Sequence, residues 1–177
     1  MKILRGEGVS PDVIEAISEE IRRIYSGILD EVKTDDVFEV TAKAYDGGRD
    51  QYRADIVLGE VLSECGSGES KVLAVVDADL YSEGLNFVFG QAQKPGKIAL
   101  ISLHRLRPNF WGGRKDEDLF LRRAVKEAVH ELGHTFGLDH CDNRACVMTF
   151  SNRIAHTDRK KPSFCESCRE KLKDLSI

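Results

Sequence analysis

Residues 130–140 read HELGHTFGLDH and close a helical pattern that starts near Asp116. Because His130 and His134 are four residues apart, a helix places both imidazoles on one face, one turn apart, within reach of one ion. Gly137 should end the helix, since glycine readily adopts the left-handed conformation of a helix C-cap. The chain then turns, and His140 can return to the same ion. The apolar residues with helical spacing in this segment are Leu121, Val125, Ala128, Val129, Leu132 and Phe136.

Three neutral imidazoles would leave one position of a tetrahedral zinc ion open, as catalytic zinc sites require. Glu131 follows His130 directly and points about a quarter turn away, beside the ion rather than at it. It is therefore predicted to act as the general base for a zinc-activated water in peptide-bond hydrolysis. A chance pair of histidines on a helix is the alternative, but Gly137 and His140 make the longer pattern specific. A catalytically weak zinc protein that binds peptides or a partner remains the second functional hypothesis.

The chain on the N-terminal side of this helix alternates strand-like and helix-like patterns. Strands are predicted at residues 2–4, 37–45, 72–76, 86–92 and 97–103, and helices from Pro11 onward and at 51–64. The apolar run at 72–76 is typical of a central strand. This order predicts an α/β (α+β) fold, with a mixed sheet packed on helices that include the long helix of the histidine motif.

Four of the five cysteines lie in the last 37 residues and form two local pairs: Cys141, Cys146, Cys165 and Cys168. Both pair spacings can place two sulfurs on one ion, so a closed structural zinc site is predicted. The alternatives are a redox dithiol in the second pair, or two disulfides. A final helix is expected from about Cys165. Cys65 has no local partner and is expected to be a small buried apolar residue.

The composition is that of a globular protein: 177 residues, 41% hydrophobic and 32% charged, with a net charge of −4. The length predicts one domain over 1–177, with an N-terminal subdomain at 1–137 and a small C-terminal one at 138–177. The acidic balance argues against nucleic-acid binding, including binding by the cysteine cluster. Apolar runs are too short to cross a membrane, and the first residues lack a signal-peptide core. A cytoplasmic monomer is therefore expected.

The extended histidine motif resembles that of the metzincin metallopeptidases, in which a methionine-containing turn lies beneath the metal. Met148 stands at a fitting place for that turn. With the four cysteines added, the chain looks like an archaemetzincin, and residues 79–92 are also similar to that family. The resemblance implies a zincin fold, with a twisted sheet over the active-site helix, and two zinc ions. His130, His134 and His140 would bind the catalytic ion, and Met148 would form its hydrophobic floor.

The same resemblance implies a peptide or protein substrate that pairs with an edge strand. The residues expected there are Asn86, Phe87, Val88, Phe89 and Gly90. An ordinary sheet edge is the alternative for this segment. His156 lies after the methionine turn and is expected to be a solvated loop residue rather than part of the active site.

Overall fold

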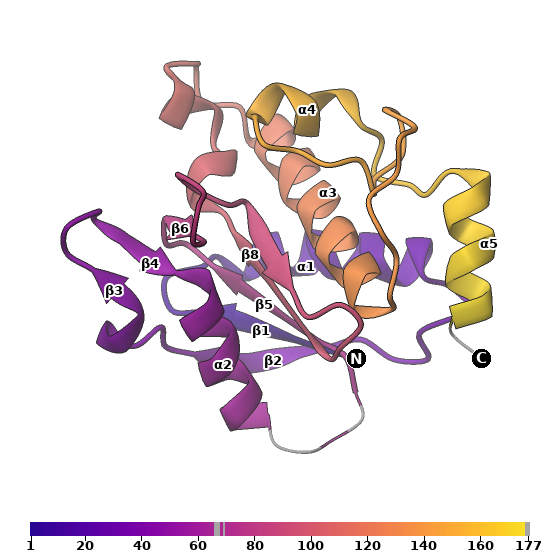
Figure 1. Cartoon of the computed structure of the whole chain (residues 1–177), viewed down its shortest axis with the longest axis horizontal. Helices are drawn as coiled ribbons and strands as arrows, with labels where there is room; N and C mark the ends of the chain where they lie inside the picture. Colours follow the sequence, from indigo (N-terminus) through magenta and orange to yellow (C-terminus); the bar gives the residue numbers. More distant parts are fainter. Residues whose placement is uncertain (66–67, 69, 176–177) are drawn as a thin grey trace.

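The computed structural model describes residues 1–65, 68 and 70–175, and Figure 1 shows the arrangement of the elements. The main sheet has the strand order β2-β1-β5-β8-β7. Four of these strands run parallel, and β7 pairs antiparallel with β8 at one edge. The bounds are Lys2–Gly6 for β1, Lys33–Phe38 for β2, Val72–Val76 for β5, Gly90–Ala92 for β7 and Ile98–Ser102 for β8. The mixed sheet predicted from the sequence is confirmed.

Helices cover both faces of this sheet (Figure 1). Side chains alternate along β5, so that Leu73 and Val75 pack with α1 (Pro11–Ile24) and α3 (Glu117–Thr135). Leu73's neighbours along the strand pack with α2 (Ala54–Cys65) on the other face. Every residue of β5 is therefore buried, which explains why this strand is a continuous apolar run.

The long helix α3 begins and ends as the sequence predicts. Asp116 is the N-cap residue, and its side chain accepts a hydrogen bond from the backbone N–H of Leu119 (2.9 Å). The helix ends just before Gly137, whose φ of +101° lies in the left-handed region. Tyr25, the C-cap residue of α1, is buried against α3, and its hydroxyl donates to the carbonyl oxygen of Val129 (2.8 Å).

After α3 the chain forms an irregular segment, then α4 (Ile154–Arg159) and α5 (Glu166–Leu175). Figure 1 shows α5 at the opposite end of the molecule from the small sheet β3-β4-β6. Met148 and Phe164 are buried in the same apolar cluster as α1 and α3, as is Leu172 of α5. The C-terminal segment is thus anchored through the core that lies between α3 and the main sheet.

Two expectations about local structure on the N-terminal side of α2 are wrong. The strand at 37–45 is instead β2 at Lys33–Phe38, because parallel pairing with β1 selects an earlier segment in which Lys2 also pairs with Asp36. Residues 42–44 form a 3-10 helix, and Thr41 accepts a bond from the N–H of Lys43 at its start. The helix at 51–64 starts late, because Gln51–Arg53 forms β4, between β3 (Tyr45–Asp46) and β6 (Leu80–Tyr81).

The strand predicted at 86–92 is shorter in the structure, where only Gly90–Ala92 forms β7 and Val88 makes an isolated bridge to Leu80. The loop expected around His156 contains α4, and His156 is half-buried in it. Within the described residues, no helix combines the length and apolar character that crossing a membrane requires.

Candidate metal centres and active site

The histidines of α3 and the turn after it converge at one point. His130, His134 and His140 each place a ring nitrogen within 4.8 Å of the others. The turn at Gly137 makes this possible, because the N–H of Leu138 bonds back to the carbonyl oxygen of Gly133 (3.2 Å). The chain then reverses, and the His140 ring lies 4.8 Å from that of His134. The sequence prediction that these three side chains meet is confirmed.

Backbone carbonyls orient two of the imidazoles. Nδ1 of His130 lies 2.8 Å from the carbonyl oxygen of Val147, and Nδ1 of His134 lies 2.7 Å from that of Leu138. A carbonyl oxygen only accepts hydrogen bonds, so Nδ1 carries the proton in both rings and each Nε2 is left with a lone pair. These two Nε2 atoms are 3.2 Å apart. Two lone pairs so close together repel unless a cation lies between them, which fits a metal ion.

Burial keeps these rings neutral, as metal ligands must be. It lowers the pKa of His134 to about 4 and the pKa of His130 well below its usual value. Neither ring then competes for a proton near neutral pH. This donor set of neutral imidazoles suits zinc.

Glu131 lies beside this cluster, with only 6% of its surface exposed. Burial, together with the charge of nearby Glu127, raises the pKa of its carboxyl to about 8, although Lys160 opposes the rise. Glu127 and Lys160 form an ion pair of 3.0 Å, which is a charge contact rather than an aligned hydrogen bond. A carboxyl with such a pKa can both take up and release a proton near neutral pH.

The edge strand β7 lies directly on Glu131 because residue 90 has no side chain. A Cβ at Gly90 would lie 2.6 Å from Cγ of Glu131 and 2.7 Å from the carbonyl oxygen of Leu100. Both contacts are shorter than van der Waals separation. Gly90 thereby allows the backbone of the edge strand to lie against the buried carboxyl.

A cleft of about 260 Å³ opens over the histidines and Glu131. Four of the five predicted edge residues line it, namely Phe87, Val88, Phe89 and Gly90. Asn86 is not among the lining residues, and its carbonyl oxygen accepts bonds from Gln51 (3.0 Å) and Arg49 (3.1 Å). Phe150 also lines the cleft, and its ring lies 5.0 Å from that of His140.

Met148 packs against a helical glycine of α3. A Cβ at Gly133 would lie 2.6 Å from Sδ of Met148. Gly133 and the carbonyls of Leu138 and Val147 were not among the expected site residues. A glycine inside a helix costs about 1 kcal/mol relative to alanine, so Gly133 could have been read as a close-packing position. No sequence pattern marks the two carbonyls, since every residue has one.

Replacing Gly133 with alanine is expected to lower the free energy of unfolding by about 1–3 kcal/mol, because the new Cβ collides with Met148. Gly59→Ala is the matched control, since Gly59 lies in α2 with no atom within 4 Å of an added Cβ. That control should gain about 0.5–1 kcal/mol from helix propensity. Urea unfolding of both variants measures the difference, and equal gains in both would contradict the packing argument.

The second cluster consists of four thiols whose sulfurs lie within 4.8 Å of one another: Cys141, Cys146, Cys165 and Cys168. All four are free, so the disulfide alternative is not what the structure contains. Sγ of Cys141 and Sγ of Cys165 are 3.8 Å apart, well beyond a disulfide bond of about 2.05 Å. Burial raises the pKa of Cys168 well above its usual value. Four converging sulfurs fit a tetrahedral zinc ion, which deprotonates the thiols it binds.

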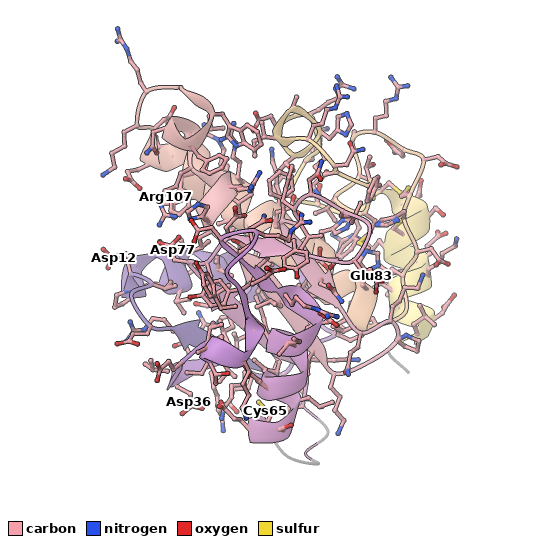
Figure 2. The ribbon with its side chains drawn as sticks, turned by 60° about the vertical axis from the view of Figure 1, so that its left-hand side comes forward. Asp12, Asp36, Cys65, Asp77, Glu83 and Arg107 are labelled. Carbon is pink, nitrogen blue, oxygen red and sulfur yellow. The ribbon has the colours of Figure 1, made fainter. Side chains whose placement is uncertain are left out.

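Cys65 lies apart from both clusters. It is half-buried at the end of α2, and Figure 2 shows it at the same end of the molecule as Asp36. Burial raises the pKa of its thiol, so its sulfur is mostly protonated near neutral pH.

Arg107 and Asp77, also labelled in Figure 2, form an ion pair of 2.6 Å that anchors the segment leading to α3.

Comparison with known proteins agrees with this geometry. The model of peptidase family M54 matches residues 39–174. The archaemetzincin of Pyrococcus furiosus is 43% identical over 169 residues, which cover 94% of this chain and 88% of that protein. The crystal structure of the Methanopyrus kandleri archaemetzincin is 38% identical, with a TM-score of 0.85, and the match covers 99% of this chain and 94% of that one.

A zinc-dependent peptidase from Methanocorpusculum labreanum is 30% identical, with a TM-score of 0.84, and the match covers 97% of this chain and 100% of that one. The family match, the sequence identities and the shared fold all agree. The chain therefore belongs to the archaemetzincins, peptidase family M54, and is a zinc metallopeptidase.

Proposed function

We propose that the chain hydrolyses peptide bonds at a zinc ion held by His130, His134 and His140. The observation that carries the proposal is the convergence of these three imidazoles beside the buried Glu131 at the base of one cleft. Zinc bound there would supply a Lewis acid that lowers the pKa of a water and polarises the substrate carbonyl. The side chains and backbone of the chain itself bind the substrate, orient the imidazoles and transfer the proton.

Glu131 is assigned the role of general base. Its carboxylate takes the proton of the attacking water and returns it to the leaving nitrogen of the cleaved peptide bond. A pKa near 8 supports the second step, because the carboxyl can hold the proton until the nitrogen accepts it. A bound cation would favour the charged form before attack, which supports the first step.

The carbonyls of Val147 and Leu138 are assigned the role of holding the imidazoles in one tautomer. Met148, packed against Gly133, is proposed to form the apolar floor beneath the imidazoles.

An extended peptide is proposed to lie along β7, the last strand of the main sheet. Backbone groups on the outer edge of a terminal strand can pair with a peptide, as in β-strand addition. Gly90 brings this edge against Glu131, so a paired peptide would pass over the base and the histidines. Phe87 and Phe150 would form apolar walls of the cleft on either side.

Replacing Gly90 with alanine is expected to lower kcat/KM for peptide hydrolysis about tenfold to a hundredfold. The added Cβ displaces either Glu131 or the edge strand, and misplacement of about 1 Å can have an effect of this size. Zinc content should be unchanged, because the histidines are not touched. Gly59→Ala on α2 is the control and should keep wild-type activity. Unchanged kcat/KM in Gly90→Ala would contradict the assigned placement of the substrate.

The four cysteines are proposed to hold a second, structural zinc ion, giving two per chain. Cys141 follows His140 directly, and its N–H bonds to the carbonyl oxygen of Met148 (3.0 Å). A zinc ion on the cysteines would therefore fix the turn that supplies the last histidine.

Residues 138–177 are proposed to form a subdomain that folds together with 1–137, because Phe164 and Leu172 share a core with α3.

The test of the proposed function is digestion of a peptide library by zinc-loaded protein, with fragments identified by mass spectrometry and zinc measured on the same sample. Cleavage that is lost on chelation and restored by zinc is the expected result. Binding of peptides without cleavage would overturn the proposal in favour of a weakly catalytic peptide-binding protein.

A further inference from the structure

A second cavity of about 250 Å³ lies next to the catalytic cleft and is lined by Arg144, Thr149, Phe150, His156 and Arg159. Both arginines are exposed to solvent, and His156 is half-buried. No acidic side chain is among the lining residues. The cavity is therefore a concave site with positive charge on two sides.

The backbone of the C-terminal segment holds the two arginines near each other although they are 15 positions apart in sequence. Arg144 lies in the turn between Cys141 and Cys146, and Arg159 is the last residue of α4. The N–H of Lys161 donates to the carbonyl oxygen of Ala145 (3.0 Å), which joins the end of α4 to that turn. This backbone contact keeps the two segments that carry the arginines next to each other.

The positive charge of the cavity is not neutralised from within the described part of the chain. Neither guanidinium belongs to any ion pair found among the described residues. Asp158 precedes Arg159, but its carboxylate accepts two hydrogen bonds from Arg123 of α3, of 2.7 and 2.8 Å. A guanidinium presents paired donors that match the two oxygens of a carboxylate. The cavity therefore offers unused donors of the type that bind carboxylates.

The cavity adjoins the proposed site of hydrolysis. Phe150 lines both the cavity and the catalytic cleft, and its ring lies 5.0 Å from that of His140. A peptide held in the cleft can therefore extend past Phe150 and place a group within reach of Arg144 and Arg159. Such a group is close in sequence to the scissile bond.

We propose that this cavity is a specificity site that binds a carboxylate of the peptide substrate through Arg144 and Arg159. This inference rests on the proposed function and identifies which peptides the same active site prefers. The carboxylate comes either from an Asp or Glu side chain near the scissile bond or from the free C-terminus of a short substrate. Both sources present the same two oxygens to the guanidinium groups.

The test uses an octapeptide library of uncharged residues with one Glu at varied positions, and a second library with Gln in place of Glu. Each is made with a free and with an amidated C-terminus. Binding is measured on the zinc-loaded Glu131→Gln variant by affinity selection and mass spectrometry, so the readout does not depend on turnover. Wild-type protein is then assayed for cleavage of the same libraries, and the fragments locate the preferred position.

The expected result is about tenfold tighter binding of one carboxylate-bearing library than of its neutral counterpart. The preference should disappear in Arg144→Gln/Arg159→Gln and weaken at high salt. Arg153→Gln is the matched control, because Arg153 is an exposed arginine of the same segment that does not line the cavity, and it should keep the preference. The charge change Arg159→Glu places a carboxylate beside Arg144 and should also abolish the preference for Glu over Gln.

A dependence on Glu identifies a side-chain carboxylate, and a dependence on the free C-terminus identifies a terminal one. Equal binding of all four libraries to the wild-type cavity would overturn the inference, even where cleavage supports the proposed function. If the carboxylate preference is present but no peptide is cleaved, the proposed function is wrong and the cavity still binds carboxylates. A preference that survives in the double arginine variant would contradict the assignment of the cavity.

Discussion

Replacing Glu131 with glutamine is expected to lower kcat/KM for peptide hydrolysis roughly 10³-fold while zinc stays bound at the histidines. The amide keeps the size and shape of the side chain but cannot take a proton from water. The proposed zinc ligands His130, His134 and His140 are unchanged, and so are the carbonyl partners of the first two. The loss should therefore fall on kcat more than on KM.

Zinc content and steady-state kinetics on the same preparation make this measurement. Activity within about threefold of wild type would show that another group acts as the base.

A second readout is the pH dependence of stability in the metal-free protein. The pKa of the Glu131 carboxyl is about 8 in the folded state, whereas the ordinary pKa of a glutamate carboxyl is 4.5. Between these values the folded state holds a proton that the unfolded state has released, so wild-type stability falls as pH rises. The glutamine variant should lose this pH dependence.

Replacing Cys168 with serine is expected to remove one zinc ion per chain and to lower the free energy of unfolding by about 3 kcal/mol or more. Cys168 is buried on α5, and its sulfur meets three others from two separate segments. Serine keeps the size but is a poor zinc ligand. The structural ion would then no longer hold α5 to the turn that carries His140 and Cys141.

The same variant should bind zinc at the histidines roughly tenfold more weakly, because that turn is less well fixed. Zinc analysis, thermal unfolding and competition with a chelator measure the three effects. Cys65→Ser is the matched control, since Cys65 lies on α2 outside both clusters and should keep two zinc ions. Two tightly held ions in Cys168→Ser would contradict the assignment of a structural site.

Much of the site could be predicted because its residues lie close together in sequence. The spacing of His130 and His134 places them on one helical face whatever surrounds them. Gly137 ends the helix by local conformational preference. The strand at 72–76 could be located because burial on both faces leaves a continuous apolar run.

The wrong expectations concern segments whose structure depends on distant partners. Val37 suggested a strand up to residue 45, yet pairing with β1 ends β2 at Phe38. Gln51–Arg53 has no strand-like pattern and becomes a strand because Tyr52 pairs with both Tyr45 and Leu80. Such pairings join residues far apart in sequence, so local propensity does not reveal them.

Local sequence patterns were enough to identify the family, the long helix and two sets of candidate metal ligands, because helical spacing and short Cys-Cys separations act over a few residues. The packing of distant segments selects the carbonyls that orient the imidazoles, places Gly90 against Glu131, and brings Arg144 and Arg159 to one cavity. These features arise where separate segments pack together, and the free energy that selects them belongs to the packed core as a whole.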